Sequence, residues 1–224
     1  MGTKQISIVP LGMTKAFIIK GIKNILVDTG MPGSFDRIMD AMKLSGIEPP
    51  EISLIVITHN HLDHVGELYR LKQFTGAEVL IHKSEAEALE KGISTDVKPT
   101  GFFGKLLLRL VKDQKITGVK ADILLEEEMS LKEYGIDGKI IHTPGHTPGS
   151  ISVILDSGEM IVGDLLSGNR ISKGKKADKP VFAVDLAALK ATLLKLADLS
   201  PKVVYNTHGV PCNGDALKSL AVRL

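Results

Sequence analysis

The feature that most constrains this chain is the stretch Leu54 to Gly66, which reads LIVITHNHLDHVG. Four apolar residues typical of a β-strand lead into four metal-ligand types within six residues, His59, His61, Asp63 and His64. An extended turn can direct His59 and His61 at one ion, while the next two side chains suit a second. The alternative is a solvated polar loop, which is usual for one or two such residues but not for four. The stretch therefore predicts a strand that ends in a metal site, with one loop able to serve two ions.

The composition is that of a globular protein. The chain has 224 residues, 43% of them hydrophobic, and we expect one domain over residues 1–224. A net charge of +2 gives no general field for nucleic acid, and no apolar run approaches the roughly 18 residues of a membrane span. The opening MGTKQISIVP lacks the apolar core of a signal peptide, and the single cysteine, Cys212, has no partner for an internal disulfide. We therefore expect a cytoplasmic protein that binds neither nucleic acid nor a membrane.

The first half of the chain alternates strand and helix patterns. Short apolar stretches between turn residues predict an opening antiparallel meander, with strands at 6–9, 16–20 and 24–28. Helical spacing then predicts a helix capped by Ser34 and ended by Gly46, and a second over 62–74 that holds Asp63 and His64 in its first turn.

The next predicted elements are a strand over 78–82 and a short helix after it. Ser84 and Glu87 have the spacing of a capping box for that helix. The segment 101–113 predicts a helix that is apolar nearly all round, because Phe102 and Leu108 fall off the face shared by its other large apolar residues. Such a helix is either buried between other elements or serves as a lid or a dimer surface, so a homodimer through 102–111 is one expectation.

The second half repeats this pattern, with candidate strands at 123–125, 139–142, 151–155, 160–162 and 203–205. Asp185 is the predicted N-cap of a helix with leucines on its inner face, and 214–222 predicts a last helix. Two mixed sheets with helices outside them make a four-layer αββα sandwich of the α/β class.

Three more ligand types follow apolar strands in this half. His146 lies in the TPGHTPGS turn, whose prolines and glycines form a rigid loop, although a histidine in an ordinary surface turn is the alternative. Asp164 ends MIVGD and His208 ends VVYNTHG. Each signal alone is weak, but four apolar strands that each end in a ligand type indicate one site, because sites gather at strand ends in layered α/β proteins.

The pattern His-x-His-x-Asp-His, with Asp28, His146, Asp164 and His208 in order around it, resembles the metallo-β-lactamase superfamily over nearly the whole chain. The resemblance implies that His59, His61 and His146 bind one metal ion, that Asp63, His64 and His208 bind a second, and that Asp164 bridges them. It also implies that Asp28 orients the ligand loop. His82 and His142 match no ligand position and are interpreted as structural, and Cys212 as an inert thiol.

Two divalent ions about 3.5 to 4 Å apart can share a hydroxide, because each lowers the pKa of bound water toward roughly 7. That hydroxide could attack an acyl bond of a small-molecule substrate, with Asp63 as a proton acceptor. Nitrogen and oxygen ligands without a thiolate favour two zinc ions, although iron or manganese would also accept them.

Within the superfamily, the resemblance favours the glyoxalase II-like and lactonase-like group, which would cleave a thioester, lactone or ester. Zinc β-lactamases generally have cysteine or serine where Asp164 stands, so β-lactam hydrolysis is a weaker alternative. A second alternative is a persulfide dioxygenase-like enzyme that binds one iron. A third is a non-catalytic metal-binding protein. Glyoxalase II also has a C-terminal helical extension that binds glutathione, whereas this chain ends soon after His208.

Substrate selection is expected to come from loops over the site. The segment 102–111 could supply an apolar wall, and the basic loop 168–180 a charged rim. Lys173, Lys175 and Lys176 of that loop could attract the carboxylate or phosphate of an anionic substrate. The alternative is a buried helix and a solvated loop, because surface lysines more often serve solubility.

Overall fold

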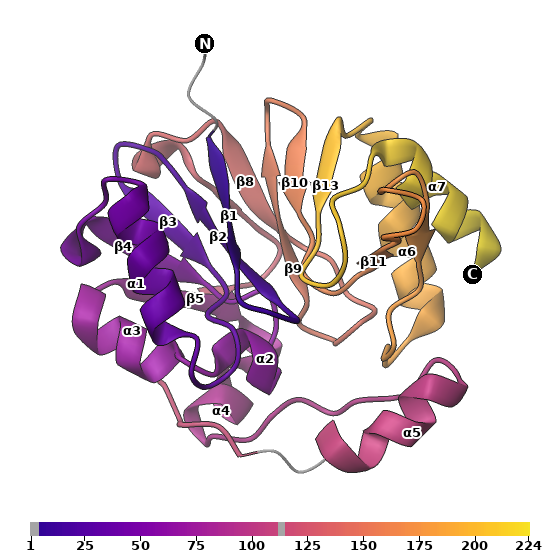
Figure 1. Ribbon diagram of the computed structural model, residues 1–224, viewed down its shortest axis with the longest axis horizontal. Helices are drawn as coiled ribbons and strands as arrows, with labels where there is room; N and C mark the ends of the chain where they lie inside the picture. The colour runs from indigo at the N-terminus through magenta and orange to yellow at the C-terminus, as the bar shows by residue number, and fades with distance from the viewer. Residues whose placement is uncertain (1–4, 112–114) are drawn as a thin grey trace.

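A computed structural model describes residues 5–111 and 115–224, and it shows four layers, with two facing sheets and helices on their outer sides (Figure 1). The first sheet has the strand order β1-β2-β3-β4-β5-β6. Its first three strands are antiparallel and the rest pair in parallel, so the sheet is mixed. These strands are β1 (Ile6–Pro10), β2 (Lys15–Ile19), β3 (Asn24–Val27), β4 (Ile52–Val56), β5 (Glu78–His82) and β6 (Ile123–Leu125).

The second sheet has the order β13-β10-β9-β8-β7, and only its β10–β13 pair is parallel. Its strands are β7 (Glu128–Ser130), β8 (Gly138–His142), β9 (Ile151–Leu155), β10 (Glu159–Ile161) and β13 (Val203–Tyr205). A small antiparallel pair, β11 (Ser167–Gly168) and β12 (Ala177–Asp178), lies within and at the start of the basic loop 168–180. The αββα sandwich with two mixed sheets is therefore confirmed.

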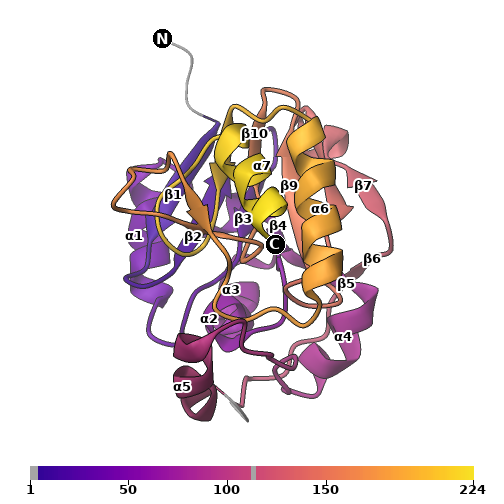
Figure 2. The same cartoon turned by 90° about the vertical axis from the view of Figure 1, so that its right-hand side faces the viewer.

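Helices cover the outer face of each sheet. In Figure 1, α1 and α3 lie outside the first sheet, and Figure 2 shows α6 and α7 side by side outside the second. The helices are α1 (Phe35–Leu44), α2 (Leu62–Val65), α3 (Leu68–Thr75), α4 (Lys83–Glu90), α5 (Phe102–Val111), α6 (Leu186–Asp198) and α7 (Gly214–Arg223), with 3-10 turns at Pro49–Glu51 and Lys132–Tyr134.

Three apolar clusters hold these layers together, and strand periodicity explains them. In β3, Ile25 and Val27 point into the cluster between the sheets, whereas Leu26 points into the cluster beneath α1 and α3. The third cluster joins the second sheet to α6 and α7, where Leu189 and Leu193 are fully buried. Because both faces of each sheet are covered, the strands appear in sequence as continuous apolar runs.

Two helix predictions were wrong in their details. The helix predicted over 62–74 is divided into α2 and α3 at Glu67, which has a φ of −110° and a ψ of 7°, whereas Gly66 before it keeps a helical conformation. The predicted capping box at Ser84 is also absent, because the N-cap of α4 lies two residues earlier. His82 is its N-cap, and its Nδ1 accepts a hydrogen bond from the Ser84 N–H at 3.3 Å.

Two predicted N-caps have different outcomes. Asp185 caps α6, since its Oδ1 accepts hydrogen bonds from the N–H groups of Ala187 and Ala188, both at 2.9 Å. Ser34 occupies the N-cap position of α1, but its side chain makes no capping hydrogen bond.

Helix α5 differs most from its surroundings, because it lies below the four layers in Figure 1. Its outer side chains Phe102, Phe103 and Leu106 are 85%, 61% and 66% exposed. A helix buried between other elements is therefore wrong for this segment. The predicted end at Asp113 lies outside the described residues.

Candidate metal centre

The loops that follow four strands bring all seven predicted ligands together. The loop after β4 supplies the His59 to His64 cluster, the turn after β8 supplies His146, and the chain after β10 and β13 supplies Asp164 and His208. They form two groups, and within each group one potential ligand atom per residue lies within 4.8 Å of the others. We call His59, His61 and His146 the first ligand group, and Asp63, His64, Asp164 and His208 the second ligand group.

The first ligand group is buried and its ring nitrogens converge. Nε2 of His146 lies 3.0 Å from Nε2 of His59 and 3.1 Å from Nδ1 of His61. The ring planes meet at 85° to 87°, so the imidazoles approach through their edges and do not stack. Three nitrogens facing one point are the arrangement that three imidazole ligands present to a metal ion.

The turn that carries His146 fixes its orientation. Nδ1 of His146 donates a hydrogen bond to the carbonyl oxygen of Phe182 at 2.7 Å, which leaves Nε2 free to face the other ligands. Gly145 has a φ of 140°, and a Cβ there would lie 2.4 Å from Cα of Leu189 in α6. Glycine is therefore required for this turn to pack on the helix.

The second ligand group alternates nitrogen and oxygen. Nε2 of His208 lies 3.2 Å from Oδ2 of Asp63 and 3.2 Å from Oδ2 of Asp164, and Nε2 of His64 lies 3.5 Å from Oδ1 of Asp164. Nδ1 of His208 lies 3.1 Å from the carbonyl oxygen of Met13, so its Nε2 also faces the group. Asp164 links the two groups, because its Oδ2 lies 3.9 Å from Nε2 of His146.

A buried carboxylate lies behind the second ligand group. Oδ2 of Asp28 is 2.9 Å from Nδ1 of His64, and its Oδ1 accepts a hydrogen bond from the Thr58 N–H at 2.8 Å. The Thr58 hydroxyl donates to the same carboxylate and lies 3.1 Å from Nδ1 of His59. The sequence prediction did not include Thr58, although its place between the strand and the first histidine was a signal for such a role.

Burial and neighbouring charges shift the pKa values of the histidines differently in the two ligand groups. Burial, with further contributions from neighbouring histidines, lowers the pKa of His146 to about 4 and also lowers the pKa of His59 and of His61. The charge of Asp164 is the main cause that raises the pKa of His208 to about 10. The first ligand group therefore contains neutral imidazoles, the form that binds metals.

The carboxylates of the second ligand group are ionised. Burial alone would raise the pKa of Asp63, but His64 and His208 together lower it to about 2. Those two histidines also hold the pKa of Asp164 well below its usual range against the effect of burial. Burial alone would lower the pKa of His64, yet Asp28, Asp164 and Asp63 raise it well above its usual value.

The donor set fits divalent metal ions. Nε2 of His64 and Oδ1 of Asp164 are fully buried and lie 3.5 Å apart, and neither makes a hydrogen bond in the described part of the chain. Unpaired buried polar atoms are costly, and a cation between the ligand groups would pair both. Imidazole nitrogen and carboxylate oxygen are ligands that zinc, iron and manganese accept.

The other predicted residues belong to neither ligand group, although the basic loop joins the His208 segment through a hydrogen bond from the Gly168 N–H to the carbonyl oxygen of His208 at 3.0 Å. Lys173, Lys175 and Lys176 are exposed, and in residues 5–111 and 115–224 no hydrogen bond or ion pair joins their ammonium groups to a ligand. Their role with substrate stays a prediction. Cys212 is buried, which raises the pKa of its thiol to about 11.

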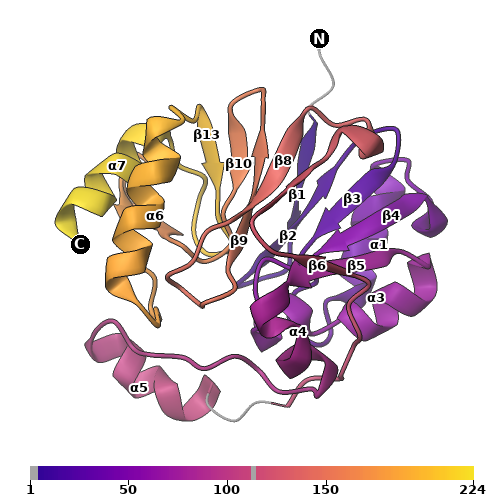
Figure 3. The ribbon, with the colours of Figure 1, turned by 180° about the vertical axis from the view of Figure 1, so that it is seen from behind.

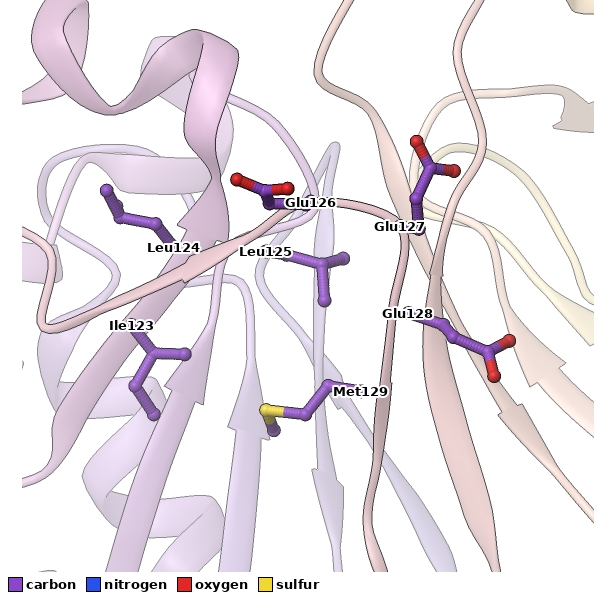
Figure 4. Close-up of a pocket in the computed structure, with 7 residues that line it drawn as sticks. All are labelled: Ile123, Leu124, Leu125, Glu126, Glu127, Glu128 and Met129. Carbon is purple, nitrogen blue, oxygen red and sulfur yellow. The ribbon is translucent and has the colours of Figure 1, made fainter.

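A pocket separate from the metal centre lies where the chain passes from β6 to β7 (Figure 4). Its polar lining consists of Glu126, Glu127 and Glu128, and none of the seven ligands lines it.

In the described part of the chain, no helix is long and apolar enough to cross a membrane.

A four-layer sandwich that gathers histidine and aspartate at its strand ends is the architecture of a superfamily of metallo-hydrolases. The chain belongs to the metallo-β-lactamase superfamily, whose family model matches residues 9–208. A probable metallo-hydrolase of Methanocaldococcus jannaschii is 35% identical over 154 residues, which cover 68% of this chain and 67% of the relative. The probable metallo-hydrolase YflN of Bacillus subtilis is 27% identical over 87% of this chain and 78% of its own length.

Solved structures show the same fold. The B3 metallo-β-lactamase BLEG-1 superposes with a TM-score of 0.72 at 22% identity, over 96% of both chains. An archaeal superfamily protein from Sulfolobus tokodaii gives a TM-score of 0.70 at 20% identity, over 99% of this chain and 86% of the other.

Proposed function

We propose that the protein is a binuclear metal-dependent hydrolase that cleaves an acyl bond in a thioester, lactone or ester, as glyoxalase II-like and lactonase-like enzymes do. The observation that carries the proposal is the position of Asp164, whose Oδ2 is 3.2 Å from His208 in one ligand group and 3.9 Å from His146 in the other. A carboxylate within reach of both groups suits a bridge between two ions.

The residues have distinct proposed roles. The first ligand group holds one ion, Asp63, His64 and His208 hold the other, and Asp164 joins them. When bound, two such ions would supply a hydroxide at neutral pH and polarise the substrate carbonyl. Asp63 is ionised and its side chain is 27% exposed, so it can accept a proton from the attacking group at the open side of the site.

Helix α5 is proposed to hold the acyl body of the substrate. Thr100 precedes the helix, and its N–H donates a hydrogen bond to the carbonyl oxygen of Val181 at 2.9 Å. Val181 adjoins Phe182, the residue bonded to His146, so α5 begins close to the first ligand group. Its exposed apolar side chains, together with the basic rim of Lys173, Lys175 and Lys176, would favour a small molecule with an apolar acyl part and an anionic end.

We also propose a cytoplasmic location. It is supported by the single buried cysteine, because extracellular domains more often rely on disulfides.

A separate proposal concerns assembly. A homodimer through 102–111 is the alternative to a substrate-binding α5, because it would cover Phe102, Phe103 and Leu106. Light scattering on the wild type and on Phe103→Ser tests the dimer, which is contradicted if both are monomers at micromolar concentration.

The test of function combines metal analysis with a substrate screen. Protein loaded with zinc, iron or manganese is assayed on thioesters, lactones, esters, phosphoesters and penicillins, and kcat/KM is compared. We expect two ions per chain and a higher kcat/KM for a thioester or lactone than for a penicillin. A clear preference for the penicillin would favour a β-lactamase. One bound iron together with persulfide oxidation would favour a dioxygenase. A metal-loaded protein that turns over none of these substrates would favour a non-catalytic metal-binding protein.

A further inference from the structure

Helix α4 contains a buried carboxylate that is not among the ligands. Figure 3 shows α4 beside the ends of β5 and β6, and the helix follows β5 directly in the chain. Glu85, in the first turn of this helix, is only 2% exposed. Glutamate is rarely buried unless it is paired, so the partners of its carboxylate indicate what the side chain does.

The two carboxylate oxygens of Glu85 bind different loops. Oε2 accepts a hydrogen bond from the Asn60 N–H at 2.6 Å, and Oε1 accepts one from the Gly149 N–H at 3.1 Å. Asn60 lies between His59 and His61, and Gly149 lies in the turn that carries His146. One side chain therefore joins both loops that supply the first ligand group.

Close packing makes this connection short. A Cβ at Gly149 would lie 2.6 Å from Cγ of Glu85, so only glycine lets the turn approach the helix to this distance. Asn60 is fixed from its other side as well, because its Nδ2 donates to the carbonyl oxygen of Ile93 at 2.8 Å.

A stacked histidine pair forms a second connection between α4 and the same turn. His82, the N-cap of α4, stacks on His142 with ring centroids 3.9 Å apart and planes 15° apart. Nε2 of His142 donates a hydrogen bond to the carbonyl oxygen of Pro148 at 2.8 Å. The start of α4 is thus attached to the His146 turn at two adjacent residues, Pro148 and Gly149.

We propose that Glu85 is a positioning residue, which sets the distance between the His59–His61 loop and the His146 turn and so determines how tightly the first ligand group binds its metal ion. The three ring nitrogens come from two loops that are far apart in sequence, so their convergence depends on what holds those loops together. Groups that orient ligands typically change metal affinity about 10- to 100-fold when they are removed. This inference rests on the proposed function, because it takes the first ligand group as a metal site.

The test replaces Glu85 by glutamine, which keeps the shape of the side chain but turns one acceptor into a donor that faces a backbone N–H. The affinity for the first and for the second zinc ion is measured by competition with a chromophoric chelator. The variants His146→Ala and His208→Ala show which of the two affinities belongs to which ligand group. We expect Glu85→Gln to weaken zinc binding at the first ligand group at least 10-fold. Zinc affinity at the second ligand group should change less than threefold. Asp122→Asn is the matched control, because Asp122 accepts a hydrogen bond from the Val79 N–H at 2.8 Å near the start of β5, at the other end of that strand from His82.

A second variant approaches the same contact from the turn. Gly149→Ala places a methyl group against Glu85 and should weaken the same binding step, so the inference remains testable if Glu85→Gln does not fold. Circular dichroism of the metal-free variants checks that they fold.

Wild-type affinity in both folded variants, or equal losses in Glu85→Gln and Asp122→Asn, would overturn the positioning role and leave the proposed function intact. Wild-type protein that binds no zinc, iron or manganese would overturn both.

Discussion

Nδ1 of His64 lies 2.9 Å from Oδ2 of Asp28, and both side chains are fully buried. Asp28 has a φ of 61°, a left-handed conformation that few residues other than glycine, asparagine and aspartate adopt readily. The end of β3 thus turns sharply to present a carboxylate to the ring of a ligand. The hydrogen bond to Nδ1 directs Nε2 of His64 toward Asp164.

We therefore expect Asp28→Asn to weaken the ion bound by the second ligand group about 10- to 100-fold. Asparagine tolerates the same backbone conformation, so the loss would come from the missing negative charge and acceptor. Competition with a chelator measures the metal affinity of the purified variant. Asp36→Asn, which changes an exposed aspartate on α1, is the control. Unchanged affinity in Asp28→Asn would show that His64 does not depend on this carboxylate.

A second prediction concerns Asp164. Replacing it by alanine should lower metal content and abolish turnover together, because one carboxylate would serve both ions. Elemental analysis and the acyl hydrolysis assay are made on the same preparation, with Asp156→Ala, an exposed position, as the control. A metal content near one ion per chain in fully loaded wild-type protein would contradict the binuclear site.

That these histidines and aspartates gather at one place could be predicted from sequence, because each follows an apolar strand. In a layered fold such strands end at a common edge, so His146, Asp164 and His208 could be assigned to one site before their contacts were known. The sandwich itself could be predicted for a related reason, since apolar runs between turn residues and helical spacing are local properties.

Features that depend on distant contacts could not be predicted in this way. Glu85 is 25 residues from Asn60 and 64 from Gly149, and the sequence shows it only as part of a helix start. Helix 62–74 is interrupted at Glu67, whose carboxylate accepts a hydrogen bond from the Gly33 N–H, a contact without a local signal. The apolar spacing of α5 was visible, but whether another element covers Phe102 depends on the whole fold.

A third prediction concerns pH and Cys212. Burial raises the pKa of its thiol to about 11 from an ordinary value of 9.0. Between these values the unfolded chain has lost the thiol proton and the folded chain keeps it, so the free energy of unfolding should fall as pH rises from about 9 to 11. Cys212→Ala should reduce this slope, as measured by urea unfolding at each pH. Native protein should also react slowly with a thiol reagent at pH 8. Rapid native labelling, or equal slopes in both proteins, would contradict the prediction.

The last prediction concerns the charged rim. If Lys173, Lys175 and Lys176 attract an anionic substrate, their joint replacement by serine should raise KM for anionic substrates severalfold and leave neutral esters unchanged. The effect should be larger at low salt, because mobile ions screen exposed charges within about 10 Å at 0.1 M ionic strength. A matched control removes the same total charge from exposed positions on other surfaces, namely Lys43, Lys120 and Lys132. An equal rise in KM for charged and neutral substrates would show that the loop acts through its fold, and an equal effect of the control would assign the change to net charge.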